Sequence, residues 1–385
     1  MSSSSCLIIA GEKSGEEHCL SFFSSLKKQC PQVDFFGVGG DELEQEGMKL
    51  IYHLKDFSSW GYSEVFKKIP FYLNATDEIV SEVKSRNCKT AILVDFQTFN
   101  MRLAKKLKKE GIKVLYVVAP QAWAWKSWRV KTLKQIVDKL YTIIPFEKDW
   151  FKSRGVKQTI SIDHPVYTKY FEDLSTFNRV INQPLKNKSK IKLLLLPGSR
   201  NFEVRNLLPL FSKVIQNLQG ENRFEVSIVK SPSVKESVYN SVDMAYDKTY
   251  ENTEVVSAIK DADICLAASG TVTLTCGLFQ LPTIVCYKTS LLNQWVFETF
   301  IKYDGAISLN NIIHQEMLFP EFVQDDLEPY ILTKALENWI ENHEVYNGLV
   351  KKLGETKKIV QGECSDLASH FASEIGLAKE KEVKE

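Results

Sequence analysis

Short apolar runs rich in β-branched residues alternate with longer amphipathic segments along most of the chain, and this rhythm constrains the fold more than any other feature. A strand–helix–strand rhythm predicts parallel sheets that are covered by helices on both faces. We expect strands at the following positions: Leu7–Ala10, Asp34–Val38, Thr90–Asp95, Lys113–Val118, Leu140–Ile144, Lys192–Leu196, Glu225–Val229, Ile264–Ala268 and Thr283–Tyr287.

A polar stretch that carries a proline, Asn178–Ser189, divides this series into two. A chain of 385 residues also suits two domains better than one. We therefore expect an α/β protein with two Rossmann-like domains, residues 1–180 and 190–350, that face each other across a cleft. In such folds ligands bind at the carboxyl ends of the strands, so the functional groups are expected there.

The overall charge and the cysteines limit the partners and the compartment. The 49 lysines and arginines are balanced by 48 acidic residues, and a net charge of +1 gives no basis for general binding to nucleic acid. The eight cysteines form no CxxC pair, which is typical of reduced thiols in a cytosolic protein. The start of the chain lacks the basic region of a signal peptide, and no apolar run approaches the ~18 residues of a spanning helix. The sequence therefore predicts a cytoplasmic protein.

Three turns that follow predicted strands and precede predicted helices are candidates for binding anions. Gly11–Gly15 offers free backbone N–H groups to an anion or a sugar hydroxyl, unless it is only a tight connection. In the second domain, Leu196–Arg200 supplies a capping hydroxyl and a guanidinium, although a capped helix with a surface arginine has the same pattern. Ser269–Thr271 supplies further hydroxyl and N–H groups. Two such turns in one domain predict a diphosphate site.

Asp95 ends the third predicted strand, where a carboxylate reaches the carboxyl edge of the sheet. It is a candidate general base, and the alternative is a capping aspartate without a chemical role. The six histidines have no metal-ligand spacing, and no Cys/His cluster exists. We therefore expect neither a metal ion nor a cofactor.

The segment Ala122–Lys131 interleaves aromatic and basic residues. On one exposed face this composition suits an anionic membrane interface, and the alternative is that some tryptophans belong to the core and the cations are ordinary surface residues. Phe66–Tyr72 has a similar mixture. The candidate membrane-contact residues are Trp123, Trp125, Lys126, Trp128, Arg129 and Lys131.

Taken together, these motifs resemble the lipid-A-disaccharide synthase family of bacterial glycosyltransferases, which have the GT-B fold. The match runs from about Ile8 to Gln324. The ordered pieces that carry it are Ala10–Gly15, Gly37–Gly40, Gly61–Val65, Asp95–Asn100, Ala119–Lys126, Pro145–Glu147, His164–Pro165, Leu195–Arg200 with Glu203, Ser269–Thr271, Tyr287–Lys288, Leu309–Asn311, and Pro320–Glu321 with Gln324.

The resemblance implies an inverting, metal-independent reaction. A 2,3-diacylglucosamine unit passes from its UDP form to 2,3-diacylglucosamine 1-phosphate, and the products are the β-1,6-linked disaccharide 1-phosphate and UDP. Asp95 matches the base that accepts the proton of the acceptor 6-hydroxyl, and Arg200 matches an arginine that stabilises the leaving diphosphate. The other implied substrate-binding residues are Gly11, Ser14, Gly15, Gly61, Glu64, Asn100, Ser199, Glu203, Ser269, Gly270, Thr271, Asn311, Glu321 and Gln324.

The resemblance also implies a location and a further packing contact. Trp123, Trp125 and Lys126 fall where the family has its membrane-facing, acyl-binding segment. The inner leaflet is therefore an expected partner, and the protein is expected to associate peripherally with the inner membrane. In the GT-B fold the C-terminal helix, here at about residues 351–378, packs back on the first domain. A homodimer is left open.

Three positions depart from the family pattern. Thr98 replaces a second acid after Asp95, Asp163 replaces a glycine, and Thr275 replaces a glutamate that GT-B enzymes often use on the ribose. Two other functions remain as alternatives. One is an isomerase similar to UDP-N-acetylglucosamine 2-epimerases, which share this architecture, and the other is a non-catalytic protein that binds a sugar nucleotide at the membrane.

Overall fold

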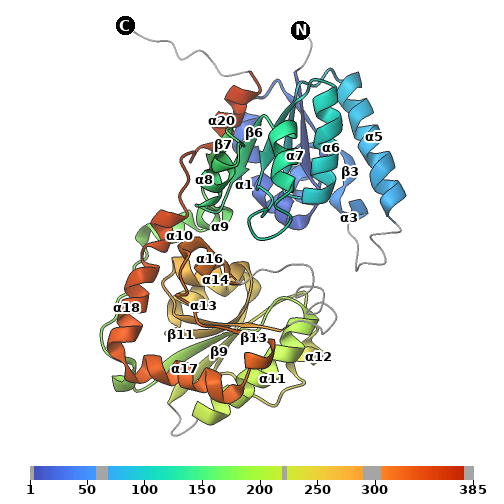
Figure 1. Ribbon diagram of the computed structural model, residues 1–385. Coiled ribbons are helices and arrows are strands. Elements are labelled where there is room, and N and C mark those ends of the chain that lie inside the picture. Colours follow the sequence, from blue (N-terminus) through green and yellow to red (C-terminus); the bar gives the residue numbers. More distant parts are fainter. Residues whose placement is uncertain (1–3, 58–67, 219–222, 289–304, 377–385) are drawn as a thin grey trace. The chain divides into compact units, whose positions relative to one another are not determined.

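The computed structural model describes residues 4–57, 68–218, 223–288 and 305–376, which form two compact units (Figure 1). The first unit comprises Met1–Lys169 together with Gln361–Glu385, and the second comprises Tyr170–Val360. Each unit contains one parallel sheet with helices on both of its faces.

In the first unit the described residues form a seven-stranded parallel sheet in the order β3-β2-β1-β4-β5-β6-β7. Its strands are β1 (Ser5–Ala10), β2 (Asp34–Gly39), β3 (Lys49–His53), β4 (Thr90–Val94), β5 (Lys113–Val117), β6 (Lys139–Thr142) and β7 (Thr159–Ser161). The chain order reverses between β1 and β4, which is the switch point of a doubly wound fold. The helices of this unit are α1 (Lys13–Gln29), α2 (Asp41–Gln45), α3 (Leu54–Phe57), α5 (Ile69–Ser85), α6 (Gln97–Lys109), α7 (Arg129–Ile136), α8 (Glu147–Ser153), α9 (Pro165–Lys169) and α20 (Leu367–Glu374).

Strand β1 explains why this sheet needs helices on both faces. All six of its residues are buried. Leu7 and Ile9 belong to one core, together with residues of α5, α6 and α7, whereas Ile8 belongs to the other, with residues of α1 and α20. Because successive side chains of a strand point to opposite faces, an apolar strand of this kind is stable only between two helical layers.

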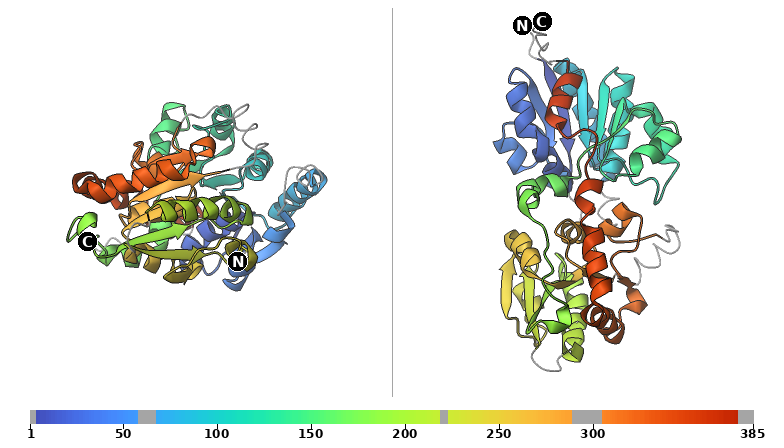
Figure 2. Two further views of the ribbon diagram at one scale, coloured as in Figure 1. Left: turned by 90° about the horizontal axis from the view of Figure 1, so that it is seen from below. Right: turned by 90° about the vertical axis from the view of Figure 1, so that its left-hand side faces the viewer.

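The C-terminal segment completes the first unit. Phe371 of α20 packs edge-on against Phe22 of α1, with ring centroids 4.9 Å apart, and the right-hand view of Figure 2 shows the two helices side by side. Asp163 accepts a hydrogen bond from the backbone N–H of Gly362 at 2.8 Å. A Cβ atom on Gly362 would lie 2.3 Å from the backbone of Ile162, so this close approach requires glycine. Asp163, a departure from the family pattern, therefore fastens the returning chain.

In the second unit the described residues form a six-stranded parallel sheet in the order β10-β9-β8-β11-β12-β13. Its strands are β8 (Ile191–Leu196), β9 (Phe224–Lys230), β10 (Lys248–Glu251), β11 (Ile264–Ala268), β12 (Thr283–Tyr287) and β13 (Glu321–Val323). The α-helices are α10 (Phe171–Thr176), α11 (Asn201–Leu218), α12 (Glu236–Tyr239), α13 (Val255–Asp261), α14 (Thr271–Leu278), α16 (Leu309–His314), α17 (Pro329–Glu341), α18 (His343–Leu353) and α19 (Thr356–Ile359), and the short 3₁₀ helices are Leu185–Asn187, Asn252–Glu254 and Gln324–Asp326.

The first unit ends at Lys169, whereas the sequence placed its end at residue 180. The structural reason is Arg179, whose guanidinium donates hydrogen bonds to the carbonyls of Ile259, Ala262 and Phe279 in the second unit. At the other end α18 and α19 lie in the second unit, so the returning segment begins at Gln361 and not at about residue 351.

Candidate functional site

Asp95 lies directly after β4, at the carboxyl edge of the first sheet. Its backbone has φ 50° and that of the next residue, Phe96, has φ 44°. This left-handed region is unfavourable for residues with a side chain, and such strain is common at functional sites. The Asp95 N–H donates to the carbonyl of Val117 at 2.9 Å, which fixes the turn to β5. A Cβ on Gly11 would lie 2.4 Å from the Phe96 ring, so the turn after β1 can approach only with glycine there.

The Asp95 carboxylate is placed to act on a proton. Its Oδ2 accepts a hydrogen bond from Ser14 Oγ at 3.2 Å. Burial raises the pKa of Asp95, and the hydrogen bonds from Ser14 and from the Phe96 backbone offset this only in part. Burial and the nearby Asp95 charge also raise the pKa of Glu12, so two carboxylates share this edge. A carboxylate with a raised pKa is a stronger base than an ordinary one.

Four further residues were expected in this site, and two of them, Asn100 and Gly15, lie within the described ranges. Asn100 is fully buried, and its amide donates to the backbone carbonyls of Val94 and Asp95 at 3.2 and 2.9 Å, so it holds the turn of Asp95. A Cβ on Gly15 would lie 3.3 Å from the carbonyl of Val94, which places the start of α1 close against β4. Gly61 and Glu64 lie outside the described residues.

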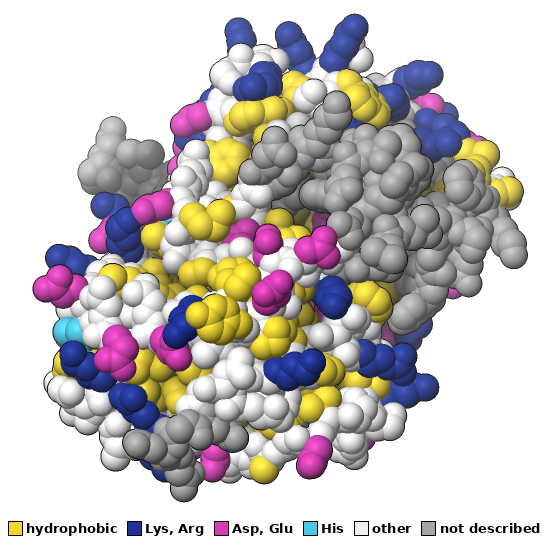
Figure 3. Space-filling model, turned by 60° about the horizontal axis from the view of Figure 1, so that its bottom comes forward, with side chains coloured by type: hydrophobic (Ala, Val, Ile, Leu, Met, Phe, Trp, Pro, Cys, Tyr) yellow, Lys and Arg dark blue, Asp and Glu magenta, His cyan; other side chains and the backbone are white. Residues whose placement is uncertain are grey.

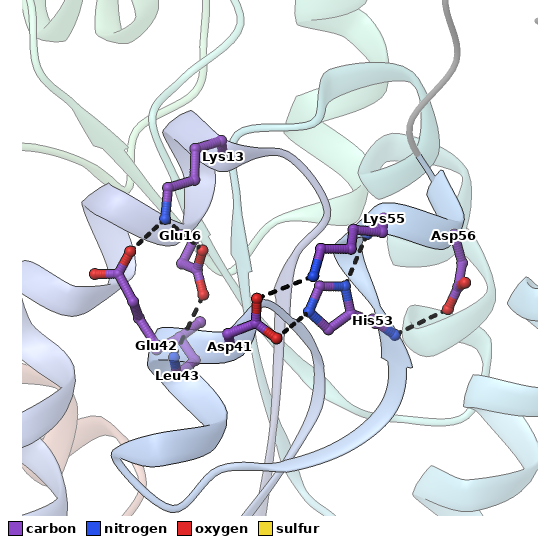
Figure 4. Close-up of polar contacts among 8 residues, drawn as sticks. All are labelled: Lys13, Glu16, Asp41, Glu42, Leu43, His53, Lys55 and Asp56. Atoms are coloured by element: carbon purple, nitrogen blue, oxygen red, sulfur yellow. Dashed lines mark hydrogen bonds and ion pairs between the residues drawn. The ribbon is translucent and has the colours of Figure 1, made fainter. Parts of the chain in front are cut away.

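Two groups of polar contacts lie at the carboxyl ends of β1, β2 and β3 (Figure 4). The buried Glu16 of α1 accepts from the N–H of Leu43, in the first turn of α2, and from Lys13 at 2.9 Å. Asp41 of α2 binds the side chains of His53 and Lys55. These contacts tie α1 to α2, and α2 to the end of β3.

The aromatic and basic segment divides into buried and exposed residues. Trp123 Nε1 donates to the buried carboxyl of Glu147 at 2.8 Å, and burial raises the pKa of Glu147 to about 8. Trp128 is 64% exposed, and Lys126 and Lys131 are exposed as well. Arg129 is only 4% exposed, which differs from the surface position expected for it.

The two anion-type turns of the second unit line one cavity of about 300 Å³. The turn after β8 contributes Gly198, Ser199 and Arg200, and the turn after β11 contributes Ser269, Gly270 and Thr271. The strand order brings these turns together, since β8 and β11 are neighbours in the sheet. Other lining residues that the sequence motifs did not identify come from the ends of β9 and β10, namely Val229, Ser231, Asn252 and Val255.

Glu203 organises the first of these turns from inside α11. Its carboxylate accepts hydrogen bonds from the backbone N–H groups of Ser199 at 2.9 Å and Arg200 at 3.2 Å. It also pairs with the Arg200 guanidinium at 3.2 Å, while 81% of the Arg200 side chain stays exposed. Gly198 has φ 113°, and a Cβ there would lie 2.4 Å from the Glu203 carboxylate. Glu203 therefore caps the helix and leaves Arg200 at the mouth of the cavity.

The turn after β11 offers unused donors. Ser269 Oγ donates to the carbonyl of Ile307 at 3.1 Å, which leaves its oxygen available as an acceptor. Among the described residues, no acceptor binds the N–H groups of Gly270, Thr271 and Val272 at the start of α14. Such N–H groups at a helix N-terminus attract anions.

Glu321 and Asn311, which the resemblance places on the donor side, form hydrogen bonds within the second unit. The Glu321 carboxylate accepts from the N–H groups of Ile307 and Ser308 at 2.7 and 2.9 Å. Asn311 is fully buried, and its amide donates to Glu321 at 2.7 Å. These two residues therefore hold the segment beside Ser269. Gln324 begins a 3₁₀ helix with φ 52° and does not line the cavity.

Three further findings concern metal ligands, the helices and the surface charge. Within the described ranges, no group of three or more histidine, cysteine or acidic residues could hold a metal ion, and none of the helices there is both long and apolar enough to cross a bilayer. Basic and acidic side chains are interspersed on the face shown in Figure 3.

Comparison with known proteins decides the family. A family model described as lipid-A-disaccharide synthetase matches residues 6–374. The chain belongs to this family. The lipid-A-disaccharide synthase of Myxococcus xanthus is 33% identical over 364 residues, which cover 91% of this chain and 93% of the relative. That of Francisella philomiragia is 31% identical over 356 residues, with 91% and 93% covered. The predicted family is confirmed, and the chain is an enzyme, a glycosyltransferase of lipid A biosynthesis.

Solved structures confirm the predicted GT-B fold class of this lipid-A-disaccharide synthase family member. A putative UDP-N-acetylglucosamine 2-epimerase from Listeria monocytogenes superimposes with a TM-score of 0.61 at 10% identity, and 98% of each chain is covered. CalG4, the calicheamicin glycosyltransferase, gives a TM-score of 0.59 at 12% identity, again with 98% of each chain covered. Identities this low show the fold alone.

One departure from the family pattern lies beside the cavity of the second unit. Thr275, where the pattern has a glutamate, is only 4% exposed on α14. It is therefore unsuited to reach a ribose. Asn252 and Ser231 line the cavity and offer the polar side chains that a ribose or a base needs.

Proposed function

We propose that this protein transfers 2,3-diacylglucosamine from its UDP form to the 6-hydroxyl of 2,3-diacylglucosamine 1-phosphate, with inversion at the anomeric carbon. The products are the β-1,6-linked disaccharide 1-phosphate and UDP. The observation that carries the proposal is the Asp95 carboxylate, which is held at the carboxyl edge of the sheet with a raised pKa.

In this reaction Asp95 accepts the proton of the acceptor 6-hydroxyl as its oxygen attacks C1 of the donor sugar. The bond between C1 and the diphosphate oxygen breaks on the opposite face, which inverts the configuration. Ser14 and Asn100 act as positioning residues, because one binds the carboxylate and the other fixes its backbone.

The leaving UDP occupies the cavity of the second unit. The N–H groups at the start of α14 and the Arg200 guanidinium bind the diphosphate, and they stabilise the charge that develops as the bond to C1 breaks. Ser199 adds a hydroxyl donor, and Ser269 holds the neighbouring segment through its hydrogen bond to the carbonyl of Ile307. Glu203 acts through Arg200 and the turn, since its carboxylate already binds their N–H groups.

Both substrates carry acyl chains, so the enzyme must meet a lipid surface. The exposed Trp128 and Lys131 are described side chains suited to contact an anionic inner leaflet. This arrangement favours peripheral association with the inner membrane.

An assay with both purified substrates tests the proposal, with the product linkage read by nuclear magnetic resonance. We expect stoichiometric UDP and a β-1,6 disaccharide, with turnover retained in EDTA. Strong inhibition by EDTA would contradict a metal-independent reaction. Conversion of UDP-N-acetylglucosamine without any acceptor would instead identify an epimerase, and binding of UDP-sugar without turnover would identify a non-catalytic protein.

A further inference from the structure

Two cations flank the indole ring of Trp125, shortly after β5. The Lys126 Nζ lies 4.1 Å from the ring centroid, and the guanidinium carbon of Arg129 lies 5.1 Å from it. The face of an indole ring attracts cations, so Trp125 holds both charges in one place.

Arg129 is buried without a matching anion. The residue is 4% exposed, and its Nη1 donates to Gln97 Oε1. Among the residues that the structure describes, no carboxylate forms an ion pair with Arg129, whereas other arginines of this unit, such as Arg86, pair with acids. Charged side chains are rarely buried unless they are paired, because removing a charge from water is costly. A buried guanidinium of this kind indicates that an anion completes the site.

Lys126 adds a second charge that also lacks a carboxylate partner within the described ranges. Its backbone is left-handed, with φ 55°, and its carbonyl accepts the N–H of Arg129 at 2.9 Å. This turn brings both side chains to the same ring. The pKa of Lys126 is lowered by burial and by the charge of Arg129, and burial lowers the pKa of Arg129, as expected for neighbouring cations without an anion.

The two cations lie close to Asp95. Gln97, the partner of Arg129, is two residues after Asp95. The Tyr116 hydroxyl connects the two regions, because it donates to the Asp95 carbonyl at 3.0 Å while its pKa responds to the charges of both Asp95 and Arg129. An anion bound by Arg129 would therefore be a neighbour of the group bound by Asp95.

We propose that Arg129, Lys126 and Trp125 form the subsite for the phosphomonoester of the acceptor, 2,3-diacylglucosamine 1-phosphate. This inference rests on the proposed function, in which Asp95 binds the 6-hydroxyl of the same sugar. On a hexopyranose, the carbons that carry the 1-phosphate and the 6-hydroxymethyl group both flank the ring oxygen, so a base and an anion site that are neighbours fit one acceptor molecule.

The charge matches as well. A phosphomonoester carries about two negative charges near neutral pH. Lys126 and Arg129, which have no carboxylate partner within the described ranges, balance these two charges. A guanidinium also presents paired donors to phosphate oxygens. Membrane phospholipids offer a phosphate too, but the burial of Arg129 places it below the surface that a bilayer would touch.

The test compares the phosphorylated acceptor with the same lipid lacking its phosphate, in detergent. The proteins are the wild type, Arg129→Gln, Lys126→Gln and a control, Lys105→Gln, which alters an exposed lysine of α6. For Arg129→Gln we expect KM for the phosphorylated acceptor to rise about 10- to 100-fold. The rise should be smaller for Lys126→Gln. In both variants the KM for the donor and the activity with the dephosphorylated lipid should stay unchanged. The control, Lys105→Gln, should match the wild type in all of these measurements.

Equilibrium binding of the phosphorylated acceptor without donor is measured in parallel. If no glycosyl transfer occurs, the proposed function fails, but this binding still decides the subsite. An Arg129→Gln protein that retains the preference for the phosphorylated lipid would overturn the proposal. If that variant does not fold, the exposed Lys126→Gln decides in its place. A contrary result would be variants that lose binding to anionic phospholipid vesicles but keep the preference for the phosphorylated acceptor. That result would assign these cations to the membrane and would also overturn the proposal.

Discussion

The two sheets share one strand order, but their carboxyl edges differ in character. At the edge of the first sheet, Asp95 and Phe96 adopt left-handed backbone conformations, and a carboxylate with a raised pKa is partly buried. At the edge of the second sheet, glycine takes the left-handed position at Gly198, and within the described residues the backbone N–H groups at the start of α14, beside a cavity, have no acceptor. Strain and desolvation suit a group that reacts, whereas open N–H groups suit the binding of a polyanion. This difference supports the proposal that proton transfer takes place at the first edge and that the leaving group binds at the second.

The largest effect is expected at the reacting edge. Asp95→Asn preserves the size of the side chain and removes the base, so turnover should fall about 10²- to 10⁴-fold. The affinity for UDP, which we propose to bind in the other unit, should stay unchanged in equilibrium binding. A parallel loss of UDP affinity would break the division between the two edges.

A loss of about 10²-fold in turnover is expected for Arg200→Ala, because removing one donor from a developing negative charge has an effect of this size. Arg200→Lys should recover part of this loss, since it restores the charge without the paired donors. Steady-state kinetics with the donor varied measures both. Equal activity of Arg200→Ala and the wild type would remove Arg200 from the leaving-group site.

Glu203→Gln is expected to have a smaller effect. The amide keeps an acceptor for the N–H groups of Ser199 and Arg200 but loses the charge, so unfolding free energy should fall by about 0.5–1 kcal/mol. KM for the donor should rise several-fold while kcat changes little. Glu337→Gln, which alters an exposed pair on α17, is the matched control. If Glu203→Gln and Glu337→Gln have the same KM for the donor, the Glu203 carboxylate does not position the turn at Ser199 and Arg200.

The last prediction concerns stability, and no effect on turnover is expected from it. Glu147 has a folded pKa of about 8, above its ordinary value of 4.5, so the folded state keeps a proton that the unfolded chain releases. Stability should therefore decline between about pH 5 and 8, by at most about 1.4 kcal/mol per pH unit from this group. Denaturant unfolding at several pH values should show this slope in the wild type and a shallower one in Glu147→Gln. An identical slope in both proteins would mean that Glu147 is ionised in the fold.

The sequence predicted the central strands of both sheets but none of the edges. Ile264–Ala268 and Thr283–Tyr287 were predicted with their observed bounds, because a strand buried on both faces has a continuous apolar run. Four strands were not predicted, and all are at sheet edges: β3, β7, β10 and β13. These strands are short and partly polar, since an edge strand is only half covered, and periodicity alone cannot distinguish them from loops.

Candidate site residues that follow predicted strands can be located from the sequence, whereas those defined by burial cannot. Asp95 and the two turns of the second unit stand out because strand ends and helix starts are readable in sequence. The buried states of Arg129 and Glu147 were not readable, because charged side chains are usually exposed and only the packed fold shows otherwise. The capping role of Glu203 depends on the left-handed turn at Gly198, which also appears only in the fold.

The pH dependence of turnover tests the central claim most directly. If Asp95 is the base, kcat/KM should fall on the acidic side with an apparent pKa above the ordinary aspartate value of 3.8, because burial raises the pKa of this carboxyl. The residual activity of Asp95→Asn should lack this limb. A wild-type rate that does not fall as the pH is lowered through this range, or the same acidic limb in Asp95→Asn, would contradict the assignment of Asp95 as the base.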